Sequence, residues 1–256
     1  MTNVKSLRTK LIPFSSTGNH ATVVYVTSDS TPDDIVKTLG IDLHNVRGVI
    51  SINGGAKDWP GNNLDLHLLL EEGIAKIAAE NSVLVVDGGT DIGVMSIIGI
   101  GVGRHGKKAP LIGIAPKKLV RFPNRFSFFP NSSKADLEPH HTHFILTPGV
   151  AWGDEIEFRS EFVRFLSNKL PSLSVVADGG DGTCLEALKD VRHGREIIVL
   201  KNSGRVADEI VRGLNHPDEI SNENIAEIVK GNVTVFNIHK APDELAKLLC
   251  VKLKLF

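Results

Sequence analysis

The segment Ser174-Val-Val-Ala-Asp-Gly-Gly-Asp-Gly-Thr183 joins a short apolar run directly to a glycine-rich turn, and this junction is the clearest indication of the fold. A second stretch repeats this arrangement as Val83-Leu-Val-Val-Asp-Gly-Gly-Thr90, and a third run ends in Asn53-Gly-Gly-Ala56. Apolar runs without strict alternation are typical of strands that are buried on both faces, as in a parallel sheet covered by helices. We therefore expect parallel strands whose carboxyl ends carry glycine turns.

Apolar runs of this kind recur along the whole chain, each ending at a turn signal. Strands are predicted over 23–27, 47–52, 83–87, 111–115, 143–147, 174–178, 196–200 and 233–238. Helical spacing of apolar residues lies between them, over 64–80, 155–169, 183–193 and 206–213. Strands and helices in alternation predict an α/β fold with a doubly wound, mainly parallel sheet and helices on both faces.

We predict a single domain over residues 1–256, since this length fits one large α/β unit. The stretch 117–139 is rich in Pro, Asn, Ser and Phe, which favours a surface lid, or a packed loop pinned by its phenylalanines. Residues 242–256 form an amphipathic pattern typical of a C-terminal helix. That helix packs on the domain or contacts a second subunit, and the second alternative would make the protein a homo-oligomer.

Charge and cysteine content narrow the class of protein. The chain has 29 Lys and Arg against 30 Asp and Glu, without the basic excess that makes binding to nucleic-acid backbones favourable. Cys184 and Cys250 lie far apart and suit a reducing compartment rather than a disulfide framework. No apolar run has the length of a membrane span. The sequence therefore predicts a cytoplasmic protein with neither a membrane nor a nucleic acid as partner.

Glycine turns at the ends of parallel strands can hold a phosphate. A glycine lets a ligand approach the backbone, and the start of the following helix attracts an anion. In an open α/β sheet, ligands bind at the carboxyl ends of the strands. The alternative is that these glycines only allow the backbone to make a tight turn. Gly99, Gly101 and Gly103 are not a dinucleotide fingerprint, because they follow a helix-like segment; close packing or a helix end explains them.

The motif that continues from Gly179 to Glu186 is the most specific of the three turns. Thr183 can cap the next helix or bind a phosphate, and Glu186 follows three residues later, near the same mouth. The same pair also fits a capping box, in which Thr183 and Glu186 bind each other's backbone amides. The two interpretations are compatible.

At this motif the chain resembles the SLOG superfamily, whose signature is Pro-Gly-Gly-x-Gly-Thr-x-x-Glu. This superfamily has a Rossmann-like fold and includes the lonely-guy phosphoribohydrolases and the lysine decarboxylase-like proteins. Asp178 stands in place of the proline, and the other positions match through Glu186. Lonely-guy proteins cleave a nucleotide between base and ribose, so the resemblance implies an N-glycosidase that uses Glu186. The carboxylate that replaces the proline is expected to weaken the binding of an anion at this turn.

A closer resemblance, over about residues 45–213, is to the N-terminal SLOG region of melastatin-type TRP channels and its free-standing prokaryotic relatives. It rests on pieces that occur in the same order: Asn53-Gly-Gly-Ala-Lys57, Gly88-Gly-Thr-Asp-Ile-Gly-Val-Met95, Gly113-Ile-Ala-Pro116, Leu137-Glu-Pro-His-His-Thr-His-Phe-Ile-Leu146, Gly153-Asp-Glu-Ile-Glu-Phe-Arg159 and Lys201-Asn-Ser-Gly-Arg-Val-Ala-Asp208.

This resemblance implies binding or sensing of an NAD-derived nucleotide such as ADP-ribose. We expect neither a separate cofactor nor a metal. The implied ligand-binding residues are Gly54, Gly55, Gly88, Gly89, Thr90, Gly93, Arg159, Gly179, Gly180, Gly182, Thr183, Gly204 and Arg205. Arg159 and Arg205 would pair with the pyrophosphate, which suits the planar fork of a guanidinium. Alternatively, Arg159 is a surface charge beside Glu155 and Glu157, and Arg205 is an exposed residue at a helix start.

The cluster His140, His141 and His143 has no assigned role. Three imidazoles can hold zinc, but the spaced Cys or His partners of a zinc site are missing. Structural hydrogen bonding or contact with a nucleotide base is the preferred interpretation.

Overall fold

The computed structural model describes residues 7–56, 63–107, 109–123 and 133–256. Within them, nine strands form one sheet in the order β1-β2-β8-β5-β4-β3-β9-β10-β11. All neighbours are parallel except the β1–β2 pair. The strands are β1 Arg8–Phe14, β2 Asn19–Tyr25, β3 Gly48–Gly54, β4 Val83–Asp87, β5 Leu111–Pro116, β8 His143–Thr147, β9 Ser172–Ala177, β10 Glu196–Lys201 and β11 Val233–Asn237. The predicted Rossmann-like α/β fold is confirmed.

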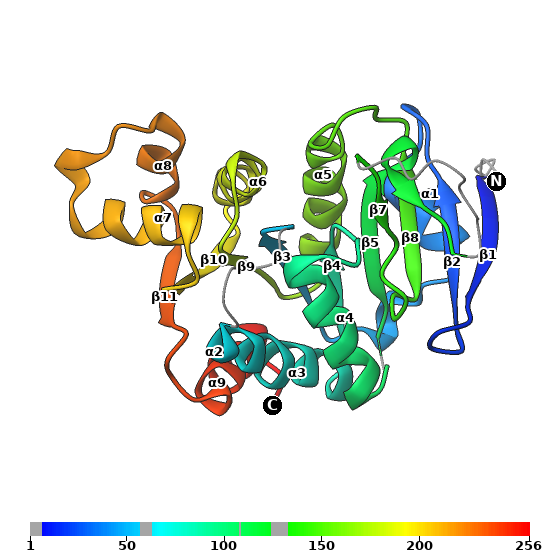
Figure 1. The fold of residues 1–256 in the computed structure, drawn as a ribbon, viewed down its shortest axis with the longest axis horizontal. Coiled ribbons are helices and arrows are strands. Elements are labelled where there is room, and N and C mark those ends of the chain that lie inside the picture. Colours follow the sequence, from blue (N-terminus) through cyan, green and yellow to red (C-terminus); the bar gives the residue numbers. More distant parts are fainter. Residues whose placement is uncertain (1–6, 57–62, 108, 124–132) are drawn as a thin grey trace.

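Helices cover both faces of this sheet (Figure 1). One face carries α1 Pro32–Thr38, α5 Ile156–Ser167, α6 Asp181–Arg192, α7 Arg205–Asn215 and α8 Glu223–Ile228. The other carries α2 Leu64–Leu68, the π-helical segment η2 Leu69–Ala75, α3 Lys76–Glu80, α4 Gly93–His105 and α9 Pro242–Leu253. The continuous stretch from α2 to α3 matches the helix expected over 64–80.

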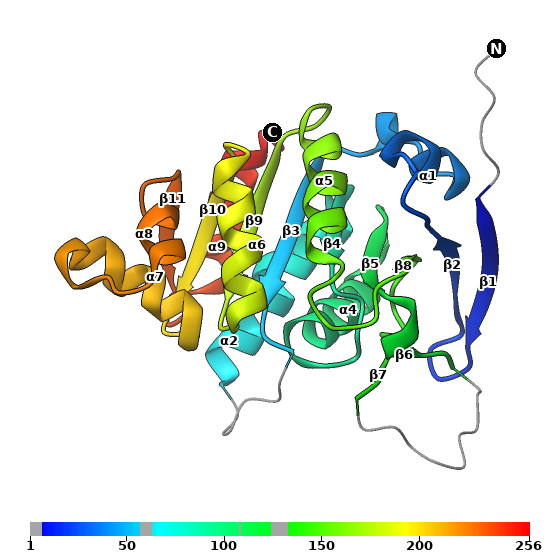
Figure 2. The same cartoon turned by 90° about the horizontal axis from the view of Figure 1, so that it is seen from above.

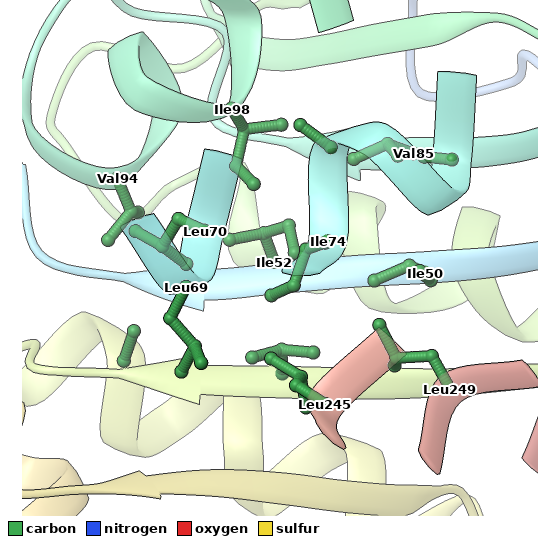
Figure 3. Close-up of a cluster of buried hydrophobic side chains, with 14 of the residues drawn as sticks. Ile50, Ile52, Leu69, Leu70, Ile74, Val85, Val94, Ile98, Leu245 and Leu249 are labelled. Carbon is green, nitrogen blue, oxygen red and sulfur yellow. The ribbon is translucent and has the colours of Figure 1, made fainter. Parts of the chain in front are cut away.

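Strand β3 shows why its apolar run does not alternate with polar residues. Val49 packs with α1 and α5 on one face, while Ile50 and Ile52 pack with η2, α4 and α9 on the other (Figure 3). Burial of one such side chain contributes about 1.5–3 kcal/mol. Apolar residues on both faces of β3 therefore hold the two helical layers against one sheet.

The order of the strands creates a switch point beside β3. The chain places β4, β5 and β8 successively on one side of β3, and then returns to place β9, β10 and β11 on the other side. Gly54 and Ala177 end β3 and β9 side by side, as Figure 2 shows for the two strands. A crevice forms where the strand order reverses in this way, at the carboxyl ends of the strands.

The predicted lid lies partly outside the described residues, which omit 124–132. Its described ends approach each other, because β6 Val120–Arg121 pairs with β7 Ala135–Asp136. In the part of the chain that the structure describes, no helix is both long and apolar enough to cross a membrane.

Candidate functional site

A cavity of about 310 Å³ lies at the switch point, where the turns after β3, β4 and β9 meet. This volume falls in the range of pockets for small molecules. Most of the predicted site residues line it: Gly54, Gly55, Gly88, Thr90, Arg159, Gly180, Gly182, Thr183, Glu186 and Arg205. The fold thus brings residues from five separate segments of the chain to one place.

The wall next to β9 is the start of helix α6. This helix begins at Asp181 after Gly180, and Cys184 N donates the first bond of its ladder, to Gly180 O at 3.0 Å. The preceding amides lie at the helix start, where unpaired N–H groups and the helix dipole attract an anion. The cavity therefore has one wall suited to a phosphate.

The capping-box interpretation of Thr183 and Glu186 is wrong. The residue that caps α6 is Gly180, and no side chain accepts a bond at that helix start. Thr183 falls inside the first turn, because the left-handed backbone of Gly179, with φ +91°, bends the chain sooner than the apolar pattern suggested. Thr183 and Glu186 instead share the same wall of the cavity, as expected from their spacing.

Arg159 is buried, so its interpretation as a surface charge is wrong. It lies in α5, and it is 6 % exposed. Its Nη2 donates to Ile52 O at 2.5 Å and to Asn53 Oδ1 at 2.7 Å. Its Nη1 donates to Glu186 Oε1 at 2.8 Å. Asn53 is itself held by Asp190 Oδ2 at 2.6 Å. The guanidinium is therefore fixed in the cavity wall by neighbours on β3 and α6.

Two carboxyl groups, Glu186 and Glu155, share the wall with Arg159. Burial raises the pKa of Glu186 to about 7; Arg159 opposes this shift, and Glu155, Asp190 and Asp87 add to it. Burial also raises the pKa of Glu155, although its carboxylate accepts a bond from Gly153 N at 2.9 Å. Glu186 can therefore change its protonation near neutral pH, a property useful in acid–base chemistry.

Arg205 lies at the rim of the cavity, as the first residue of α7. Its side chain is 42 % exposed and forms a two-point ion pair with Asp178, including Nε to Oδ1 at 2.8 Å. This contact raises the pKa of the guanidinium. The residue that replaces the signature proline thus binds the arginine that was expected to meet a phosphate.

The four other predicted glycines shape the turns behind the cavity and do not line it. A side chain on Gly93 would clash with Gly55 O, and one on Gly179 would clash with Thr183. Gly89 packs on Gly113, and Gly204 has φ +113° beside Asp178. Their contact with a ligand stays a prediction.

Two residues of the wall, Trp152 and Glu155, were not predicted from the sequence. Both belong to the loop before α5, where no periodic pattern marks them. Trp152 is 47 % exposed, and its Nε1 donates to Ser133 O at 3.2 Å. The sequence did contain one indication of their role. Glu155 lies within the segment Gly153–Arg159 that carries the family resemblance, and Trp152 directly precedes this segment.

A glycine-lined cavity at the switch point of a parallel sheet is typical of Rossmann-like proteins that bind ligands at this place, and the fold puts the chain in the Rossmann-like class. The family model described as "SLOG in TRPM, prokaryote" matches residues 47–247. The chain belongs to this family.

Similar proteins include cation channels. The chain is 27% identical over 223 residues to the transient receptor potential cation channel subfamily M member 2 of Mus musculus, covering 72% of this chain and 15% of the channel. It is 26% identical over 218 residues to the subfamily M member-like 2 protein of Nematostella vectensis, covering 71% of this chain and 14% of that protein. The chain thus matches only a small part of the length of these relatives.

Proposed function

We propose that the cavity binds an NAD-derived nucleotide, for which ADP-ribose is the model ligand. One observation carries the proposal: two arginines and the start of α6 surround one cavity at the switch point. Charge-assisted bonds from a guanidinium to phosphate oxygens are among the strongest hydrogen bonds in proteins. Membership of the SLOG family supports a nucleotide-related role.

The arrangement of the wall suggests how such a ligand lies. The phosphates go to the amides of Gly182 and Thr183 and to the exposed edge of Arg205. The indole of Trp152 offers an aromatic surface on which a base can stack. Glu155 and Glu186 can accept bonds from ribose hydroxyl groups.

Calorimetric titration with ADP-ribose, AMP, NAD and adenosine tests the proposal. We expect the phosphorylated ligands to bind and adenosine to bind much more weakly, because helix-start amides and arginines recognise phosphate rather than base. The absence of heat and of a melting shift with every phosphorylated ligand would contradict the proposal.

A second candidate function is hydrolysis of the bond between base and ribose. It is favoured by the buried carboxyl of Glu186, whose pKa lies near 7 and which faces the same cavity as Glu155. Water would add across the N-glycosidic bond and give the free base and a ribose hydroxyl, and a positioned carboxyl typically accelerates proton transfer by about 10²–10⁴-fold.

Chromatography for free base after incubation with AMP, NAD and cytokinin-type nucleotides tests this second function. Release of base that is lost in Glu186→Gln would establish hydrolysis by this residue. Release that persists in Glu186→Gln would clear Glu186 of the role.

A further inference from the structure

The segment Asp136–His141, here called the strap, runs along the turn that follows β4. Asp91 N donates to Asp136 O at 2.8 Å, and Glu138 N donates to Gly89 O at 3.0 Å. Between these bonds, Thr90 and Leu137 form an isolated antiparallel bridge. The strap therefore pairs by its backbone with the turn that brings Gly88 and Thr90 to the cavity.

A chain of buried side chains reinforces this pairing. Asp87 Oδ1 accepts a bond from Gly89 N at 2.7 Å and lies 2.8 Å from His141 Nε2. His141 Nδ1 lies 2.7 Å from Glu138 Oε2. The other carboxylate oxygen of Glu138 lies 2.6 Å from His140 Nδ1. Asp87, His141 and Glu138 are all fully buried.

The two carboxylates keep the imidazole between them protonated. Burial alone lowers the pKa of His141, but Asp87 and Glu138 outweigh it and raise that pKa to about 10. Burial alone raises the pKa of Glu138, but the bonds from His140 and His141 bring it to about 2. His141 is thus an imidazolium that donates from both ring nitrogens, one to each carboxylate.

Helix α4 leaves space for this ionic chain. A side chain on Gly99 would clash with the carboxyl of Glu138, and one on Gly103 would clash with the ring of His140. The close packing expected for these glycines is therefore packing against the strap. Buried ion pairs stabilise a fold weakly, and well-packed apolar residues often replace them without loss. A purpose other than stability is thus indicated.

We propose that His141 and Glu138 are positioning residues of the nucleotide site, which hold the Gly88–Thr90 turn in the conformation that the ligand meets. Through Asp87, the imidazolium fixes the carboxylate that accepts the amide of Gly89. The proposal rests on the proposed function for its effect on ligand binding, but not for its effect on the turn.

The test compares His141→Gln with Leu253→Ala in the full chain. A glutamine carries both of its donors on one nitrogen, so it does not reproduce the two ring nitrogens of His141, each of which contacts one carboxylate. Leu253 is buried beside Gly48, the first residue of β3, at the amino ends of the strands and away from the cavity. Two quantities are measured at a temperature where each variant is folded: the hydrogen exchange rate of the Gly89 amide by NMR, and the affinity for ADP-ribose by calorimetry. Glu138→Gln, which keeps the size of its side chain, provides a second variant if His141→Gln does not fold.

We expect His141→Gln to raise the hydrogen exchange rate of the Gly89 amide about tenfold and to lower the affinity for ADP-ribose about tenfold. A tenfold change corresponds to about 1.4 kcal/mol. Leu253→Ala should lower the melting temperature and leave both quantities unchanged. Unchanged exchange and affinity in His141→Gln, or equal changes in Leu253→Ala, would overturn the positioning role. If native protein does not bind ADP-ribose, the proposed function fails, and the exchange of Gly89 alone still decides the role of the strap.

Discussion

The turns at the ends of β4 and β9 share the sequence Asp-Gly-Gly, but their aspartates bind different partners. Asp87 binds His141, which is fully buried, whereas Asp178 binds Arg205, whose side chain is 42 % exposed at the rim of the cavity. The backbones differ as well, because Asp178 adopts φ +55° and Gly179 φ +91°, while in the first turn Gly89 has the positive φ, +66°.

This difference shows that a turn obtains its role from its partner. The β4 turn is closed on its outer side by the strap, so its aspartate contributes to the framework. The β9 turn leads directly into α6, and its Asp178 binds the guanidinium of Arg205 at the mouth of the cavity. We therefore propose that the first turn shapes the site and that the second turn recognises the anion.

The largest expected effect is a loss of stability in Asp87→Asn. The substitution leaves the buried imidazolium of His141 with one carboxylate instead of two, and breaking a buried ion pair costs about 3–5 kcal/mol at most. We expect a loss of about 3 kcal/mol in urea-induced unfolding. Asp178→Asn should lose less than about 1 kcal/mol, because its partner is partly exposed. Equal losses would remove the distinction between the turns.

The next effect concerns recognition of the phosphates by the β9 side. Arg205→Ala should weaken the binding of ADP-ribose by about 1.5–3 kcal/mol, which is the contribution of one charge-assisted hydrogen bond. Arg205→Lys should restore part of this, because an ammonium does not reproduce the planar fork. Calorimetry gives the measurement, and unchanged affinity in Arg205→Ala would make this residue a surface charge at a helix start.

A smaller effect follows from the titration of Glu186. Its pKa in the folded protein, about 7, lies above its ordinary value, so its protonated form favours folding. The stability that it contributes is complete below about pH 4.5 and is lost as pH rises through 7. An ionised Glu186 also repels an anionic ligand, so the affinity for ADP-ribose should fall by about 1 kcal/mol as pH rises through 7. Glu186→Gln should flatten this profile; an affinity that rises with pH is the contrary result.

The smallest effect is a gain in affinity in Asp178→Asn. Asparagine tolerates the left-handed backbone at this position and leaves the charge of Arg205 unneutralised. We expect ADP-ribose to bind tighter by about 0.5–1 kcal/mol in a titration. Weaker binding would mean that the negative charge of Asp178 is needed to orient Arg205.

Much of the fold could be predicted from the apolar runs, because strands buried on both faces leave a clear signal. All eight predicted strands are present, and the mainly parallel sheet follows from them. Strand β1 was missed because it lies at the edge, where only Ile12 and Phe14 are buried. Its apolar residues form only the short run Leu11-Ile-Pro-Phe14, and the proline inside this run argues against a central strand.

The site was less predictable, because its decisive contacts join distant residues. The contact of His141 with Asp87 spans 54 positions, and that of Arg159 with Ile52 spans 107. Neither the burial of Arg159 nor the pairing of Asp178 with Arg205 leaves a mark in the local sequence. The glycine turns were visible because their cause, a left-handed or closely packed backbone, is local.

The most direct test of this account is a crystal structure of the protein with ADP-ribose. We expect the phosphates to lie within hydrogen-bonding distance of the amides of Gly182 and Thr183 and of Arg205, with the ligand in the cavity between β3 and β9. A ligand bound elsewhere on the molecule would contradict it, as would phosphates held by the β4 turn instead of the β9 turn.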